Sequence, residues 1–563
     1  MTQKSPTELF RRRLAVAQGL EPADRIFKGA FVLNVFTGRA EPQEIAVADG
    51  FIAAVGFGFK GRETVDLGGA CVIPGLIDAH VHIESSHLVP GAFGAAVLSH
   101  GTTTVIADPH EIANVLGEEG LAFMLSDAER SPCDIRFVLP STVPASPFET
   151  SASLLDADTT ARWLRDHPEL LGLGELMDVP GILAASDGPL AKIASASGRV
   201  LDGHFPGGTG LALQAYAGLG ISSDHEATTA AEAREKIALG IRVFIREGSG
   251  ARNLEALLPA VTDETWPMFC FCADDLCSSD LVAHGDVIHA IRRAVSLGLD
   301  PVRAVQIGSI NAARHYGLAD RGAVAPGCRA DFVAVDDFRD FAVRAVVKNG
   351  DVYRGGAEGR NLAAGTVRLP DLTSFRFPEP PAGAKKARLL RVLPTELTTP
   401  EDYCSIADLP SRDVAKLSVI ERHGKNGNIA YALAEGTGLR RGAVALTMSH
   451  DSHNLVVLGA TDADMRAAAL VAAGQGGGVA VVENGSVLAA LPLPVAGLMS
   501  GRTAEESAAL ERKVLEALRG LGVSLPSPLT TLSFLALPVI PELKLTDRGL
   551  FDVRTSEFVP VYY

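Results

Sequence analysis

The chain has few cysteines, no basic excess and no long uninterrupted apolar run. Its seven cysteines are scattered and lack paired Cys-x-x-Cys spacing, which argues against a disulfide framework or a structural zinc site. The formal net charge of −16, with both signs interspersed, disfavours nucleic-acid and anionic-membrane partners. Arg11, Arg12 and Arg13 lie within a helix-like stretch and do not precede the apolar core that a secretory signal needs. These absences predict a soluble, cytoplasmic protein with reduced cysteines, no nucleic-acid partner and no membrane partner.

The sequence does contain enough apolar residues, 47%, for several packed domains in 563 residues. Residues up to about 25 have a helical pattern, and short β-rich runs separated by turn residues follow to about residue 72. A similar β-rich pattern returns at residues 330–350. We therefore expect a small β-sandwich built from both flanks of an inserted domain. Its first part, with the N-terminal helix, is residues 1–73, and its second part is residues 321–354.

The inserted segment, residues 74–320, alternates β-rich runs with helical runs such as 230–239 and 284–297. After a first strand at 76–78, the expected strands are 103–107, 135–139, 171–175, 200–203, 220–223, 243–246 and 268–273. This alternation indicates βαβ units, and its length matches a closed (β/α)8, or TIM, barrel of about 250 residues. Residues 355–395 are rich in Pro, Gly and charge and predict a linker, and residues 396–563 predict a C-terminal mixed α/β domain. The expected fold class is α/β.

A pair of histidines, His80 and His82, directly follows the apolar run at residues 71–79. Alternate side chains of a strand point the same way, so both imidazoles can reach one metal ion. Taken singly, such residues are more often structural, and Asp274 would fit a helix cap. However, ligand-type residues then recur at the ends of the expected strands, namely Glu175, His204, His225 and Asp274. Their joint order predicts a metal centre and is similar to that of the amidohydrolase superfamily.

Longer runs carry a closer resemblance. They are PGLIDAHVHIESS at 74–86, GTTTVIADPHE at 101–111, GISSDHE at 220–226, IREGS at 245–249, DRGAVAPG at 320–327 and SHDSHN at 449–454. Each resembles the bacterial type of adenine deaminase, and the likeness extends over nearly the whole chain. It implies a metal-dependent hydrolase of purine salvage and adenine catabolism. That enzyme would convert adenine and water to hypoxanthine and ammonia, with a metal-activated hydroxide attacking C6 and Asp274 as proton shuttle.

The resemblance also implies two divalent metal ions, with Mn2+ or Fe2+ favoured over Zn2+, and a homo-oligomer, a dimer. One ion would be held by His80, His82, Glu175 and Asp274, and the other by Glu175, His204 and His225. Glu175 stands where the superfamily often has a carbamylated lysine, and it needs no modification to bridge two ions.

The remaining candidates lie on loops after the first two expected strands and in the last domain. The expected substrate-binding residues are Glu84, Ser85, Asp108, His110 and Glu111. Of these, Glu84 or Asp108 would protonate or hydrogen-bond a ring nitrogen or only order a loop. Arg246 and Glu247 would form a structural ion pair or line the pocket, and the structural role is favoured. The cluster of His450, Asp451 and His453 could bind another metal, reach across to a neighbouring active site or order a turn. We predict that His450 and His453 contact the barrel mouth.

Three other functions compete with this interpretation. The nearest is another cyclic-amide amidohydrolase, dihydroorotase-like or hydantoinase-like. A non-catalytic metal-binding assembly protein is disfavoured because Asp274 is present beside the ligands. A nucleic-acid base deaminase is disfavoured by the acidic charge and by the missing His-x-Glu and Pro-Cys-x-x-Cys motifs.

Overall fold

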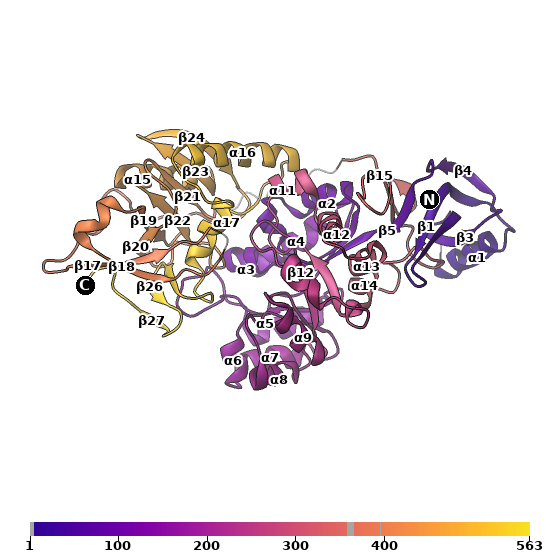
Figure 1. The fold of residues 1–563 in the computed structure, drawn as a ribbon, viewed down its shortest axis with the longest axis horizontal. Coiled ribbons are helices and arrows are strands. Elements are labelled where there is room, and N and C mark those ends of the chain that lie inside the picture. Colours follow the sequence, from indigo (N-terminus) through magenta and orange to yellow (C-terminus); the bar gives the residue numbers. More distant parts are fainter. Residues whose placement is uncertain (1–4, 357–364, 395) are drawn as a thin grey trace.

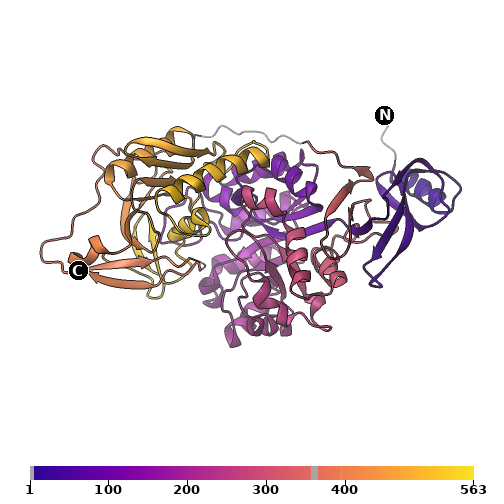
Figure 2. The same cartoon turned by 45° about the horizontal axis from the view of Figure 1, so that its top comes forward.

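The computed structural model describes residues 5–356, 365–394 and 396–563. Three parts follow one another along the long axis of the molecule (Figures 1 and 2). A sheet formed by the N-terminal strands lies at one end, the alternating segment is in the middle, and the C-terminal part is at the other end. Within the described ranges, no helix combines the length and the apolarity that crossing a bilayer requires.

The N-terminal part is one hydrogen-bonded sheet formed from both flanks of the middle segment. Helix α1 (Pro6–Ala17) begins at a capping box in which Ser5 and Glu8 cap each other, and it ends earlier than expected from the sequence. The strands are β1 (Ala23–Asn34), β2 (Arg39–Ala48), β3 (Phe51–Gly56), β4 (Gly61–Asp66), β5 (Cys71–Pro74), β14 (Phe332–Val335), β15 (Val343–Lys348) and β16 (Asp351–Val352).

The two flanks join where β5 pairs with β14 in antiparallel register. All eight strands belong to one sheet, ordered β16-β15-β14-β5-β1-β2-β3 with β4 also on β1. Both flanks therefore contribute to this unit, as expected from the sequence. The irregularity in β1 between Phe27 and Ala30 lets that strand pair first with β4 and then with β5, so the sheet stays continuous.

The middle segment contributes eight strands whose hydrogen bonds follow chain order. They are β6 (Leu76–Val81), β7 (Thr102–Ala107), β8 (Asp134–Phe137), β9 (Gly172–Leu176), β10 (Val200–Gly203), β11 (Ser223–Asp224), β12 (Arg242–Arg246) and β13 (Phe269–Cys272). Parallel ladders join β6-β7-β8, β9-β10 and β11-β12-β13. Backbone hydrogen bonds link these groups. Leu139 N donates to Gly172 O, Leu171 N to Phe137 O and Gly174 N to Leu139 O, and Ser222 N donates to Leu201 O. The last strand returns to the first, because Asp274 N donates to His80 O and His82 N to Asp274 O.

Helices connect these strands. They are α2 (Pro90–Ser99), α3 (His110–Leu116), α4 (Glu118–Ala128), α5 (Ala157–Asp166), α6 (Val179–Leu183), α7 (Asp187–Ser195), α8 (Gly210–Ala217), α9 (Ala230–Ala238), α10 (Leu254–Leu257), α11 (Ser278–His284), α12 (Val287–Ser296), α13 (Pro301–Ile307) and α14 (Ile310–His315). The helix expected at 284–297 begins only at Val287. Gly285, at φ +81°, separates it from α11 because a left-handed residue cannot continue a right-handed helix.

The C-terminal part is built on an eight-stranded sheet ordered β18-β17-β20-β19-β22-β21-β23-β24. Its strands are β17 (Lys386–Arg391), β18 (Glu401–Ser405), β19 (Val414–Ile420), β20 (Ile429–Glu435), β21 (Ala443–Leu446), β22 (Leu455–Gly459), β23 (Gly478–Glu483) and β24 (Ser486–Pro492). The helices are α15 (Asp462–Gly474), α16 (Ala504–Gly520) and α17 (Pro528–Ser533), and the short strands β25 (Leu543–Thr546), β26 (Gly549–Asp552) and β27 (Glu557–Phe558) form a further sheet.

The segment expected to be a linker, residues 355–395, is largely part of this fold. Strand β17 pairs with β18 and β20, and Leu372 and Phe375 are buried against α15 and the sheet. A high content of Pro, Gly and charge therefore did not exclude a strand here, because tertiary pairing stabilises it. Residues 357–364 and 395 lie outside the described residues. The contact of α16 with α11 joins the C-terminal part to the middle segment.

Candidate metal centre

The two histidines of the first motif lie at the end of strand β6 and directly after it, and their ring nitrogens meet. Their Nε2 atoms are 3.2 Å apart, and both side chains are buried. His82 is oriented by a contact of 3.1 Å between its Nδ1 and the carbonyl oxygen of Asp108. A ring nitrogen fixed in this way leaves the opposite nitrogen free to face a cation.

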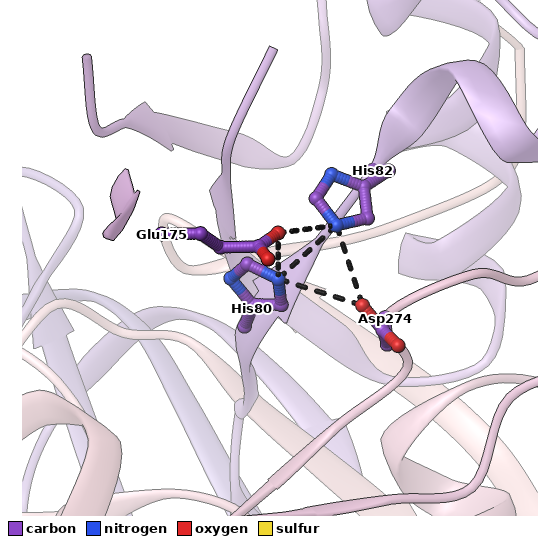
Figure 3. A group of neighbouring side chains, drawn as sticks. All are labelled: His80, His82, Glu175 and Asp274. Atoms are coloured by element: carbon purple, nitrogen blue, oxygen red, sulfur yellow. Dashed lines mark hydrogen bonds and ion pairs between the residues drawn. The ribbon is translucent and has the colours of Figure 1, made fainter. Parts of the chain in front are cut away.

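Two carboxylates complete this group (Figure 3). Glu175 Oε1 lies 3.1 Å from His80 Nε2 and 2.8 Å from His82 Nε2, and Asp274 Oδ1 lies 3.5 and 3.3 Å from the same atoms. Asp274 follows β13 with a φ of 58°, which is uncommon for a residue with a side chain. Its two backbone hydrogen bonds to β6 hold it there. The link between the last and first strands therefore places this carboxylate beside the histidines.

A second group of ligand-type atoms faces the other oxygen of Glu175. His204 Nδ1 lies 2.6 Å and His225 Nε2 3.4 Å from Glu175 Oε2. The ring of His225 stacks on that of His80 with centroids 4.3 Å apart, so the two groups are adjacent. Each group brings its ligand atoms within 4.8 Å of one another, and the structure brings together all six residues predicted from the sequence.

The carboxylates of both groups stabilise positive charge on the neighbouring imidazoles. Burial alone would lower the pKa of His80, but hydrogen bonds with Asp274 and Glu175 raise it to about 9. The pKa of His225 is also raised to about 9, despite burial and the nearby His80, by Glu175 and Glu226. Burial would raise the pKa of Glu175, yet the surrounding histidines hold it well below its usual range. Among the described residues, buried Glu175 Oε1 faces the Nε2 atoms of His80 and His82 without a well-aligned hydrogen bond, so it and these nitrogens are placed to share a metal.

A buried arginine connects the two groups. Arg246 Nη1 lies 3.1 Å from Asp274 Oδ2 and also contacts Glu226, which in turn lies 3.3 Å from His225 Nε2. The sequence favours a structural ion pair of Arg246 with Glu247 over a place in the pocket and predicts no role for Glu226, yet Arg246 and Glu226 both line the cavity over the cluster. In the structure Glu247 instead pairs with Arg293 at 3.1 Å. The only signals were the position of Glu226 directly after His225 and that of Arg246 at a strand end.

The predicted substrate-binding residues fall into two sets. Asp108 lies behind Glu175, where its Oδ2 accepts a hydrogen bond of 2.9 Å from the backbone N–H of Glu175. Glu84 accepts from Ile112 N at 3.1 Å, and burial together with the charge of Glu111 raises its pKa to about 7. Ser85 donates to Asp275 at 2.5 Å. Glu84 and Ser85 line a cavity next to the one that contains the metal-ligand cluster.

Two histidines of the last domain contact a carboxylate of the middle segment. His450 Nδ1 and His453 Nε2 each approach one oxygen of the fully buried Glu111. His110, the neighbour of Glu111, packs its ring against His82 with centroids 4.5 Å apart. Glu111 and His450 line both cavities, so this contact lies where the two cavities meet.

The cavity over the cluster also has apolar walls that sequence reasoning missed. They are formed by Met177, Leu397, Phe534, Leu537, Val539 and Ile540. All but Met177 come from the C-terminal part, far from the ligand motifs in sequence, and none carries a recognisable motif.

Comparisons with known proteins agree with this site. A family model described as "Amidohydrolase family" matches residues 71–353, and one described as "Adenine deaminase C-terminal domain" matches residues 394–557. The chain is 43% identical to "Adenine deaminase 2" of Carboxydothermus hydrogenoformans over 97% of this chain and 98% of the relative. It is 46% identical to "Adenine deaminase" of Nitratidesulfovibrio vulgaris, with the same shares covered.

A solved structure, titled "Crystal structure of an adenine deaminase", is 16% identical with a TM-score of 0.45, covering 59% of this chain and 99% of that one. Two curated relatives above 40% identity, matched over almost their full length, establish the family. The chain belongs to the adenine deaminase family of the amidohydrolases.

Proposed function

We propose that this protein catalyses the hydrolytic deamination of adenine, in which water replaces the 6-amino group to give hypoxanthine and ammonia. The observation that carries the proposal is the nearly full-length likeness to curated adenine deaminases in a chain whose six ligand-type residues converge. Both family models agree with it, one on each side of the active-site cavity. Hydrolysis of a cyclic amide, the competing function, is not favoured by these relatives.

We also propose that residues 74–320 form a closed (β/α)8 barrel, flanked by a unit from residues 1–73 and 321–354 and by the C-terminal domain. Supporting this are the parallel ladders in chain order and the return of hydrogen bonds from β13 to β6. All six ligand-type residues follow or end strands, as expected for the carboxyl-terminal face of such a barrel.

We infer that His80, His82, Glu175 and Asp274 hold one divalent ion and that Glu175, His204 and His225 hold another. The donor set of imidazoles and carboxylates, with Glu175 Oε1 facing the Nε2 atoms of His80 and His82, fits such ions. Bound ions of this kind lower the pKa of water from about 15.7 towards about 7, which supplies a nucleophile at neutral pH. Mn2+ or Fe2+ is our preferred identity over Zn2+.

Asp274 is the proposed proton carrier. Its Oδ1 faces the two histidines, while its Oδ2 is held 3.1 Å from Arg246 Nη1. Burial would raise the pKa of Asp274, but His80, His82 and Arg246 hold it well below its usual range. The carboxylate is therefore ionised and able to accept a proton from the attacking water and deliver it to the departing amine.

Glu111 and His110 are the proposed contacts of the purine ring, with Glu84 and Ser85 beyond them. Glu111 and His110 line the cavity of the cluster, and His450 and His453 hold Glu111 in place. Asp108, also predicted to bind substrate, is better placed to orient Glu175 through its backbone N–H. Finally, we propose that the protein is cytoplasmic, in keeping with its seven free cysteines, and that it forms a homodimer, as the resemblance to its family implies.

Ammonia release from adenine and adenosine tests the function, together with ring opening of dihydroorotate and hydantoin, which forms N-carbamoyl acids without releasing ammonia, and metal analysis of the purified protein. We expect release from adenine only. Turnover of a cyclic amide without turnover of adenine would overturn the proposal.

A further inference from the structure

The apolar residues above the metal-ligand cluster are buried but do not belong to the core of their own domain. Phe534 and Leu537 are 8% and 5% exposed, yet neither packs into any of the hydrophobic clusters of the C-terminal part. Their neighbours Leu535 and Ala536 do pack into one of these clusters. The chain between residues 534 and 540 thus directs one set of side chains to its domain core and another to the cavity.

Phe534 is held parallel to a histidine of the cavity. The ring of His450 stacks on it with centroids 4.4 Å apart and an interplanar angle of 22°. His450 in turn contacts Glu111, so a flat aromatic surface adjoins the polar groups of the cavity. A planar heterocycle with polar edges suits such a surface, because its faces need apolar contact and its edge needs hydrogen bonds.

A buried lysine supports this segment. Lys544 lies on β25, where alternate residues Leu543 and Leu545 face the domain core and Lys544 faces the other way. Its side chain is fully buried, and its Nζ donates to Leu397 O at 2.8 Å and to Phe534 O at 2.9 Å. Those two carbonyls belong to the two C-terminal segments that line the cavity.

Stability alone does not account for this lysine. Among the described residues no carboxylate forms an ion pair with Lys544, and burial lowers its pKa to about 7. Burying a charge-bearing group without a counter-charge is costly, and a methionine of similar length would avoid that cost. What the lysine adds is a double hydrogen bond that ties residue 397 to residue 534.

We propose that Phe534 and Leu537 form the apolar wall against which the purine ring of the substrate packs, and that Lys544 is the positioning residue that fixes this wall. The proposal rests on the proposed function for the identity of the ring. It assigns the C-terminal domain a direct part in substrate selection.

The test compares two leucines of the same turn. Leu537→Ala removes a wall side chain, and Leu535→Ala removes a core side chain of the same size. For each variant we measure KM and kcat for adenine, the Kd of purine (the parent ring, which has no amino group to release) by calorimetry, metal content and Tm. We expect Leu537→Ala to raise KM and Kd about three- to tenfold, since it removes apolar contact, with kcat nearly unchanged. Leu535→Ala should lower Tm and leave KM and Kd unchanged.

Lys544→Met and Lys544→Gln test the positioning role. The methionine lacks donors, whereas the glutamine amide keeps two. We expect Lys544→Met to raise KM and Kd as Leu537→Ala does, without loss of metal or of Tm, and Lys544→Gln to restore part of the affinity. A lower Tm with unchanged KM and Kd in Lys544→Met would overturn the positioning role.

Equal effects of the two leucine variants on KM and Kd would overturn the wall, even in an enzyme that deaminates adenine. A wild-type protein that binds purine but releases no ammonia from adenine would overturn the proposed function alone, because the shifts in Kd still report on the wall.

Discussion

Asp274 has two proposed roles, as a metal ligand and as a proton carrier, and replacing it with Asn separates them. The amide keeps one oxygen, which can still face His80 and His82, but it cannot carry a proton. Loss of a general acid–base group typically lowers kcat by about 10²-fold or more, which corresponds to about 2.7 kcal/mol in activation free energy. The substitution also removes the charge-assisted hydrogen bond of 3.1 Å to Arg246, which costs about 1.5–3 kcal/mol of stability.

The assay is ammonia release from adenine by protein whose metal content and Tm have been measured. We expect Asp274→Asn to retain most of its metal, to have a lower Tm and to lose at least about 10²-fold in kcat. Glu226→Gln is the matched control, because it removes the other carboxylate partner of Arg246 and leaves Asp274 intact. Its kcat should fall much less. Near wild-type kcat in metal-loaded Asp274→Asn, or an equal loss in Glu226→Gln, would refute the shuttle.

Four further outcomes are expected. Glu175→Gln should lose both metal and activity, since both groups of ligand atoms share this carboxylate. If elemental analysis finds one equivalent of metal in fully active wild-type enzyme, the proposal of two ions is contradicted. Adenine should have a higher kcat/KM than adenosine, and steady-state comparison decides this. Replacing both His450 and His453 with Ala should raise KM and leave metal content intact, because they contact Glu111 and no proposed ligand; loss of both metals would count against it. Between pH 7 and 10 the unfolded chain binds more protons at Lys544 than the folded chain does, so this residue makes the free energy of unfolding rise with pH. Lys544→Met should therefore flatten the dependence of Tm on pH, by an amount equivalent to at most about 1.4 kcal/mol per pH unit.

The local parts of the site could be predicted from the sequence. His80 lies in β6 and His82 follows its last residue in extended backbone, so the period of a strand alone brings their rings together. Glu175 and Asp274 each end a run of apolar residues, His204 directly follows the short strand β10, and the carboxyl ends of parallel strands meet at one edge. The shortest strand was the hardest to place. Strand β11 (Ser223–Asp224) has only two residues, so its expected position at 220–223 was early, but His225 still follows it.

Contacts between distant segments could not be predicted in the same way. No pattern near Phe534 in the sequence predicts its contact with His450 or its position near the metal ligands. Phe534 lies over the cavity because the C-terminal domain packs on the middle segment. The same holds for β17. Its composition predicts a linker, but in the structure it is a strand because it pairs with β20. Propensity and periodicity act over a few residues, so they determined the strands, the ligand types and their order along the chain. Only the packing of whole domains decided which apolar side chains close the site, because burial depends on what lies opposite and not on what lies next in the chain.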